Sequence, residues 1–233
     1  MQRVLHQFEC SPYCTKVRAV LHLKQLRYTT VEVLPKLHRN LGAMPGHSQL
    51  PMLIDDTRRI CDSTEIALYI DTAYPEGVRL VPEDPRGYRE CFLWEDWSDE
   101  ALGPMVVWAL LDHARRNPAF ARELLPPLGN QTMEMLLRRG LPVFLPLIQA
   151  RYRLKSTRDQ TNLNRLDRAL DFLAGSVAAT SNLVGERTTL ADVAVATMTR
   201  HLHLLPRYAG RHTPYRRLFQ WRDGVLDQCL IQS

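Results

Sequence analysis

Residues 10–14 read Cys-Ser-Pro-Tyr-Cys, and this pentapeptide is the part of the sequence best suited to sulfur chemistry. It lies between a short apolar run at residues 4–8 and a helical pattern at residues 16–23. The first turn of such a helix offers free backbone N–H groups and a positive dipole end, and both favour a thiolate. Because Ser11 rather than a cysteine precedes the proline, the pentapeptide alone does not decide which sulfur reacts. Ser11 followed by proline is also an ordinary helix start.

Two later segments have residue types that suit ligand binding. Leu50-Pro51 begins a predicted strand, where the proline is either an ordinary strand start or, with a cis bond, exposes the backbone of Leu50 to an extended peptide. Asp62 and Glu65 have the spacing of a capping box before a helix at residues 66–73. The same helix start suits a ligand carboxylate and, at Asp62, an ammonium group.

The elements that must position these residues fall into two dissimilar parts. Strand and helix patterns follow the order β-α-β and then β-β-α, over residues 4–8, 16–23, 29–33, 52–54, 59–61 and 66–73. Beyond residue 85 only helical patterns follow, and the proline-rich stretch between the two parts is a natural linker. We predict an α/β domain at residues 1–75, a linker at 76–85 and an all-helical domain at 86–233.

The predicted helical domain begins with a long amphipathic pattern at residues 88–116, which Gly103-Pro104 should kink. Thr189 and Asp192 resemble the start of a capping box. We expect the acidic cluster on the first helix to be a solvated face; it comprises Glu95, Asp96, Asp99 and Glu100. Further helices are predicted at residues 130–153, 159–174, 189–204 and 214–228.

Composition is that of a soluble globular protein, with 45% hydrophobic and 24% charged residues among 233. The formal net charge of +5 comes from basic residues scattered along the chain, which favours a solvated surface over nucleic-acid binding. No apolar run approaches the roughly 18 residues of a membrane span. Five cysteines, an odd number, argue against a secreted disulfide framework, so we expect a cytoplasmic protein.

Taken together, the three segments resemble the glutathione S-transferase family, and the resemblance extends over essentially the whole chain. Residues 11–18 read Ser-Pro-Tyr-Cys-Thr-Lys-Val-Arg, which is similar to the signature at the start of the first helix in that family. Residues 46–53 look like the segment leading to the cis-proline of the family, and residues 62–70 are similar to its glutathione-carboxylate motif. The resemblance implies a thioredoxin-like α/β domain followed by an all-α domain.

The resemblance also implies a glutathione site and a reaction. Ser11 would hydrogen-bond the glutathione sulfur and favour its thiolate, which would attack a small hydrophobic electrophile in a detoxification-type conjugation. The remaining glutathione contacts would come from Gln49, Leu50, Pro51, Asp62 and Ser63. No metal is implied, and homodimerisation is expected from the resemblance alone.

Alternatives to this interpretation remain at the sequence level. Cys10 and Cys14 are redox candidates, because thiol transferases of the same fold use a cysteine where Ser11 stands. The third hypothesis is a non-catalytic family member, a binding module that has the fold but catalyses no reaction. Tyr13, Met105 and Trp108 are candidates for the wall of an electrophile pocket, although such a stripe at helical spacing is also typical of a core.

Overall fold

The computed structural model describes residues 3–33, 50–117, 119–120, 135, 159–210 and 214–229. A four-stranded sheet lies in the N-terminal part, with the strands in the order β2-β1-β3-β4. Strand β1 is parallel to β2 and antiparallel to β3, and β3 is antiparallel to β4. The bounds are β1 Arg3–Gln7, β2 Thr29–Glu32, β3 Met52–Asp55 and β4 Arg58–Cys61. The predicted order of strands and helices is therefore confirmed.

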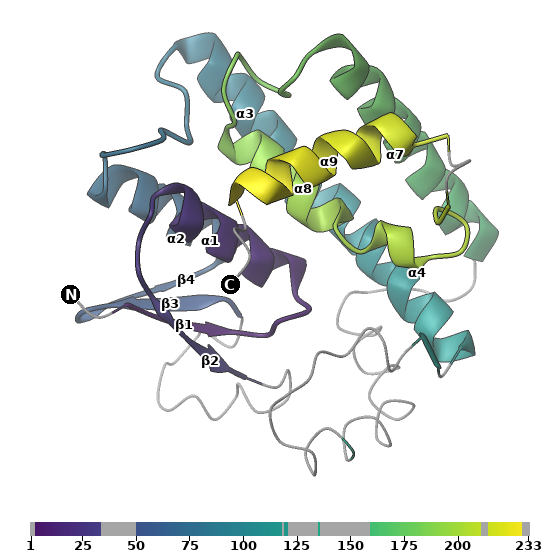
Figure 1. Cartoon of the computed structure of the whole chain (residues 1–233), viewed down its shortest axis with the longest axis horizontal. Helices are drawn as coiled ribbons and strands as arrows, with labels where there is room; N and C mark the ends of the chain where they lie inside the picture. Colours follow the sequence, from purple (N-terminus) through teal and green to yellow (C-terminus); the bar gives the residue numbers. More distant parts are fainter. Residues whose placement is uncertain are drawn as a thin grey trace.

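Two helices cover one face of this sheet, α1 at Pro12–Leu23 and α2 at Ser63–Ala73 (Figure 1). Each begins at a polar residue whose side chain accepts a hydrogen bond from a backbone N–H of the first turn, Ser11 for α1 and Asp62 for α2. Apolar residues of α1 and α2, such as Val17 and Ile66, are fully buried together with Leu5 and Leu53 of the sheet. These caps and this packing set where the two helices start above the sheet.

The remaining described elements are helical, as predicted. The long pattern breaks where Gly103-Pro104 starts a new helix, but the break includes a short π-helical segment that the pattern did not predict. The predicted helix at 189–204 instead ends at Thr199, and a short 3-10 helix follows. The elements are α3 Pro85–Trp97, η2 Ser98–Leu102, α4 Gly103–Arg116, α7 Asp159–Ala179, α8 Leu190–Thr199, η4 Leu202–Leu204 and α9 Arg216–Cys229; the helix predicted at 130–153 lies outside the described residues.

The helical part packs directly on α1, and α8 and α9 supply the contacting surface (Figure 1). The capping box at the start of α8 is present as predicted, with the Asp192 carboxylate accepting from the backbone N–H of Thr189 at 2.8 Å and of Leu183 at 2.7 Å. Buried Val193 and Val225 join the same apolar cluster as Val17. The two parts therefore share a continuous core along α1, which holds their relative orientation.

All five cysteines are free thiols. None of the helices in the described part of the chain is long and apolar enough to cross a membrane.

Candidate functional site

The strand register brings the three segments singled out in the sequence to one edge of the sheet. His6 of β1 pairs with Met52 of β3, and Met52 pairs with Cys61 of β4. Because neighbouring strands in this register are antiparallel, the chain leaves β1, enters β3 and leaves β4 at the same end. The segments just beyond these positions are the loop to Ser11, the Leu50-Pro51 dipeptide and the Asp62-Ser63 helix start.

Ser11 is the N-cap of α1 and is half-buried. Its hydroxyl oxygen accepts a hydrogen bond from the backbone N–H of Cys14 at 3.4 Å, so its role as a helix cap is confirmed. A serine hydroxyl that accepts one hydrogen bond still has its own O–H to donate. The hydroxyl lies at the end of the sheet where the positive end of the helix dipole also lies.

The Leu50–Pro51 peptide bond is cis, in agreement with the resemblance described above. Pro51 is buried and Leu50 is half-buried, directly before β3. Gln49, the neighbouring glutathione-contact candidate, lies outside the described residues.

Asp62 caps α2 from a backbone conformation that side chains rarely adopt, with φ 75° and ψ 134°. Such conformations cost on the order of 1–3 kcal/mol and cluster at functional sites. The Asp62 Oδ1 atom accepts from the backbone N–H groups of Thr64 at 2.8 Å and Glu65 at 3.2 Å. None of the described residues donates a hydrogen bond to its other carboxylate oxygen. Ser63 follows at the first helical position and is 3% exposed.

Comparison with known proteins decides the family. A family model described as the N-terminal domain of glutathione S-transferase matches residues 5–78, and one described as the C-terminal domain matches residues 146–224. The chain belongs to the glutathione S-transferase family. The α/β domain described above is therefore the thioredoxin-like domain of a glutathione S-transferase fold, and the helical part is its C-terminal domain.

Individual relatives agree with this assignment. The chain is 31% identical over 101 residues to the probable glutathione S-transferase parA of Nicotiana tabacum, and 33% identical over 100 residues to the probable glutathione S-transferase GSTU6 of Oryza sativa subsp. japonica. These matches cover 42% and 40% of this chain, and 46% and 42% of the relatives. The chain thus matches less than half the length of these curated relatives.

Solved structures show the same fold over nearly the whole chain. The β-etherase LigF from Sphingobium sp. strain SYK-6 superposes with a TM-score of 0.70 at 21% identity, covering 97% of this chain and 95% of that one. Glutathione transferase F7 from Populus trichocarpa gives a TM-score of 0.66 at 19% identity, covering 96% and 93%. The two-domain architecture of this glutathione S-transferase family member is therefore shared by both.

The two cysteines that flank Ser11 are poorly suited to act as thiolates in this family member. Burial raises the pKa of the Cys10 thiol to about 12, and the nearby Glu9 carboxylate adds to the effect. Burial likewise raises the pKa of Cys14 to about 11, although hydrogen bonds from Phe8 and Ser11 oppose the shift. Cys14 is fully buried, and its sulfur accepts from the backbone N–H of Phe8 at 3.4 Å. It packs as a small core residue.

The three electrophile-pocket candidates lie at the junction with the helical domain. Tyr13, in the first turn of α1, donates its hydroxyl hydrogen to the backbone carbonyl of Asp99 at 3.0 Å. A Cβ atom on Gly103 would lie 3.1 Å from the same hydroxyl, so glycine there leaves room for the close approach. Met105 is half-buried, whereas Trp108 is 3% exposed and belongs to the helical core. Their contact with an electrophile remains a prediction.

A buried charge cluster joins α1 to the helical domain, and the sequence interpretation missed it. The Lys16 ammonium group is fully buried and contacts Glu95 Oε1 at 2.5 Å and Asp99 Oδ2 at 2.6 Å. The expectation of a solvated acidic face is therefore wrong for Glu95 and Asp99, although Asp96 and Glu100 are exposed. The sequence feature that could have indicated this cluster is the four-residue spacing of Glu95 and Asp99, because residues at that spacing lie on one helix face.

The Lys16 ammonium group pairs with two carboxylates, so one cation does not balance the negative charge of both Glu95 and Asp99. The Oδ1 atom of Asp99 is buried without a hydrogen-bond partner, and burial raises the pKa of this carboxyl group from 3.8 to about 6. The attraction of Lys16 opposes this shift, and repulsion from Glu95 and Asp62 reinforces it. Asp99 thus takes up a proton at a higher pH than an ordinary aspartate does.

We expect Asp99→Asn to remove a pH dependence of stability. Because the folded-state pKa lies above the unfolded value, this group stabilises the protein most below about pH 4, and that contribution is lost as the pH rises through about 6. Asp99→Asn should therefore be more stable than the wild type at pH 7.5, by on the order of 1–3 kcal/mol, and lose most of this difference at pH 4.5. Urea denaturation at both pH values, with Asp96→Asn as the exposed control, measures this. A constant difference between Asp99→Asn and the wild type would contradict it.

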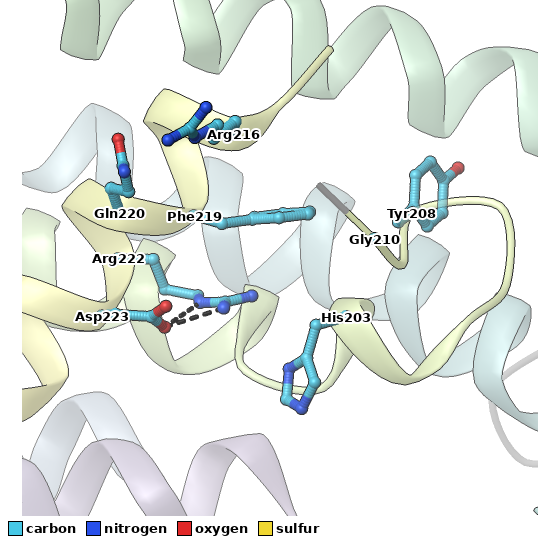
Figure 2. Close-up of a pocket in the computed structure, with 8 residues that line it drawn as sticks. All are labelled: His203, Tyr208, Gly210, Arg216, Phe219, Gln220, Arg222 and Asp223. Carbon is cyan, nitrogen blue, oxygen red and sulfur yellow. Dashed lines mark hydrogen bonds and ion pairs between the residues drawn. The ribbon is translucent and has the colours of Figure 1, made fainter. Parts of the chain in front are cut away.

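A cavity of about 390 Å³ lies in the helical domain (Figure 2). Figure 2 shows Phe219, Arg222 and Asp223 of α9 facing it, with His203 across the opening. The buried Arg222 guanidinium already bonds Asp223 and donates to the Thr199 carbonyl at 3.1 Å. The buried cation of this cavity is thus satisfied without a ligand. Among the residues that the structure describes, no group of three or more His, Cys, Asp or Glu side chains is arranged to hold a metal ion.

Proposed function

We propose that this protein is a glutathione-dependent transferase that holds glutathione as a thiolate beside Ser11 and conjugates it to a small hydrophobic electrophile. The observation that carries the proposal is the strand register, which brings Ser11, Leu50-Pro51 and Asp62-Ser63 to the same sheet edge. Glutathione has three chemically distinct parts, namely a thiol, a peptide backbone and an amino-acid end. Each of the three segments offers groups that complement one of these parts.

The amino-acid end of glutathione suits the start of α2. The Asp62 carboxylate complements the ligand ammonium group, and the first turn of α2 with Ser63 complements the ligand carboxylate. The backbone of Leu50 would pair with the extended cysteinyl residue in the manner of an added strand.

The sulfur end suits the start of α1. The Ser11 O–H would donate to the thiolate, and the helix dipole adds positive potential. At neighbouring Cys10, attraction to the Arg18 and Arg200 guanidinium groups lowers the thiol pKa, but burial and the carboxylates of Glu9 and Glu32 raise it more. Arg18 also donates to the Glu9 carbonyl at 3.2 Å and to Thr15 Oγ1 at 3.0 Å, which holds the loop before Ser11.

Titration calorimetry of the purified protein with glutathione tests the proposal, together with an assay of conjugation to 1-chloro-2,4-dinitrobenzene. We expect saturable binding in the micromolar to millimolar range and a conjugation rate above the uncatalysed reaction. A folded protein that binds no glutathione at millimolar concentration would sink this proposal and favour a non-catalytic member of the family. Binding without conjugation of any electrophile would support the same alternative.

The alternative hypothesis, a thiol–disulfide oxidoreductase that uses Cys10 or Cys14, gives a separate prediction. Because burial raises the pKa of Cys10 and Cys14 to about 12 and 11, both remain thiols at neutral pH. We expect Cys10→Ala to change the rate of hydroxyethyl-disulfide reduction by less than twofold. Cys61→Ala, which removes a half-buried cysteine outside the α1 loop, is the control. A loss of reductase activity confined to Cys10→Ala would establish a thiol–disulfide oxidoreductase instead.

Homodimerisation and a role in detoxification derive from the family alone, whereas the proposed cytoplasmic location rests on the odd number of cysteines. Surface on α3 is compatible with association, because Leu93 is 70% exposed and Tyr88 is 50% exposed. Light scattering of the purified protein would measure the oligomeric state directly.

A further inference from the structure

The buried cluster around Lys16 includes a third partner, which lies in the first turn of α2. The Lys16 ammonium group donates to Thr64 Oγ1 at 3.1 Å, and the Thr64 hydroxyl donates to Glu95 Oε1 at 2.6 Å. Thr64 Oγ1 also lies 3.4 Å from Asp99 Oδ2. The hydroxyl of Thr64 is therefore held by one cation from α1 and by carboxylates from α3 and η2.

The backbone of the same residue is tied to the proposed ligand-binding carboxylate. The Thr64 N–H donates to Asp62 Oδ1 at 2.8 Å, and this bond orients the Asp62 side chain. Asp62 also occupies its rare backbone conformation immediately before this turn. Thr64 thus links the helical domain to Asp62. Its hydroxyl bonds the buried cluster, and its backbone N–H bonds the Asp62 carboxylate.

Lys16 connects the cluster to the sulfur end as well, because it lies on α1, the helix that Ser11 caps. A single buried ammonium group therefore contacts α1, α2 and the helical domain at once. The distance between the starts of α1 and α2 is the distance that glutathione must span between its sulfur and its amino-acid end. Small movements at such a site weaken ligand binding, because the binding groups must be held within about 0.5 Å of the productive geometry.

We propose that Thr64, held by Lys16, Glu95 and Asp99, is a positioning residue through which the helical domain sets the geometry of the γ-glutamyl pocket. This inference rests on the proposed glutathione site at Asp62 and Ser63. It assigns to the helical domain a part in glutathione affinity that requires no contact with glutathione. The residue acts through Asp62 and touches no reacting atom.

Thr64→Val tests the inference, because valine keeps the shape and the β-branched character of threonine and removes only the hydroxyl. Thr72→Val, at an exposed position of the same helix, is the matched control. Calorimetry would measure the dissociation constants of glutathione and of cysteinylglycine, which lacks the γ-glutamyl residue. We expect Thr64→Val to weaken glutathione binding about fivefold, with cysteinylglycine binding and the KM for the electrophile unchanged. Thr64→Ser, which restores the hydroxyl, should return glutathione affinity to within about twofold of the wild type.

Two outcomes would overturn the inference. One is a folded Thr64→Val variant that binds glutathione as tightly as the wild type. The other is an equal loss of affinity for glutathione and cysteinylglycine, which would indicate a general structural defect. The wild-type titration separates this test from the proposed function, because absence of glutathione binding by the wild type itself contradicts the site and not the role of Thr64.

Discussion

Replacing Lys16 with methionine is expected to lower the free energy of unfolding by about 3–5 kcal/mol. Methionine preserves most of the volume of the side chain but leaves Glu95 and Asp99 facing each other without a cation. Glu95 is 1% exposed, and the Asp99 side chain is 13% exposed, so water cannot compensate for the lost partner. Urea denaturation of Lys16→Met and the wild type at pH 7.5 measures the difference.

A surface ion pair provides the control for this prediction. Arg86 and Glu90 interact at 2.8 Å with the Arg86 side chain 83% exposed, and Arg86→Met should cost less than about 1 kcal/mol. Neutralising the two carboxylates in the triple variant Lys16→Met, Glu95→Gln, Asp99→Asn should recover a large part of the stability. A Lys16→Met variant as stable as Arg86→Met would show that the cluster is hydrated in solution.

Ser11→Ala is expected to reduce kcat/KM for glutathione conjugation at least tenfold while the protein remains folded. The lost cap costs about 1 kcal/mol of stability. Without the hydroxyl donor, the pKa of the bound thiol should rise by about one unit, and the reactive thiolate fraction at neutral pH falls accordingly. Ultraviolet absorbance of the bound thiolate, titrated between pH 5 and 9, measures this pKa directly.

A second helix cap controls for the structural part of that effect. Asp84 caps α3 and accepts from the backbone N–H of Gly87 at 2.7 Å, so Asp84→Ala loses a comparable cap elsewhere. Asp84→Ala should lower the free energy of unfolding about as much as Ser11→Ala does, and it should conjugate glutathione at the wild-type rate. Equal conjugation by Ser11→Ala and the wild type would show that Ser11 serves only as a helix cap.

The local elements around the site were predictable because their signals are short-range. Ser11-Pro12 and Asp62 identify helix starts within one turn, and the Thr189–Asp192 spacing predicts a capping box that the structure contains. The break at Gly103-Pro104 was predicted for the same reason, although the π-helical turn before it was not. Gly103, directly after this turn, lies against Tyr13 and Met198, two neighbours that the local sequence does not specify.

Charge at the domain junction was mispredicted because its determinants are far apart in the sequence. Lys16 and Glu95 are separated by 79 positions, and acidic residues at helical spacing are equally typical of an exposed face. The state of the two cysteines likewise depends on burial, which raises the pKa of Cys10 in a loop that the sequence leaves open to redox chemistry.

The order of elements and the helix caps could be predicted from the residues alone, because each depends on residues close together in the chain, and three such local motifs together indicated the family. Only the tertiary structure decided which charges are buried, since burial is set by what another element places opposite a side chain. The helix start at Cys-Ser-Pro-Tyr-Cys illustrates both the local and the tertiary determinants of structure. Its cap is local, whereas the contacts of Tyr13 and Lys16 with η2 and α3 exist only once the two domains are packed.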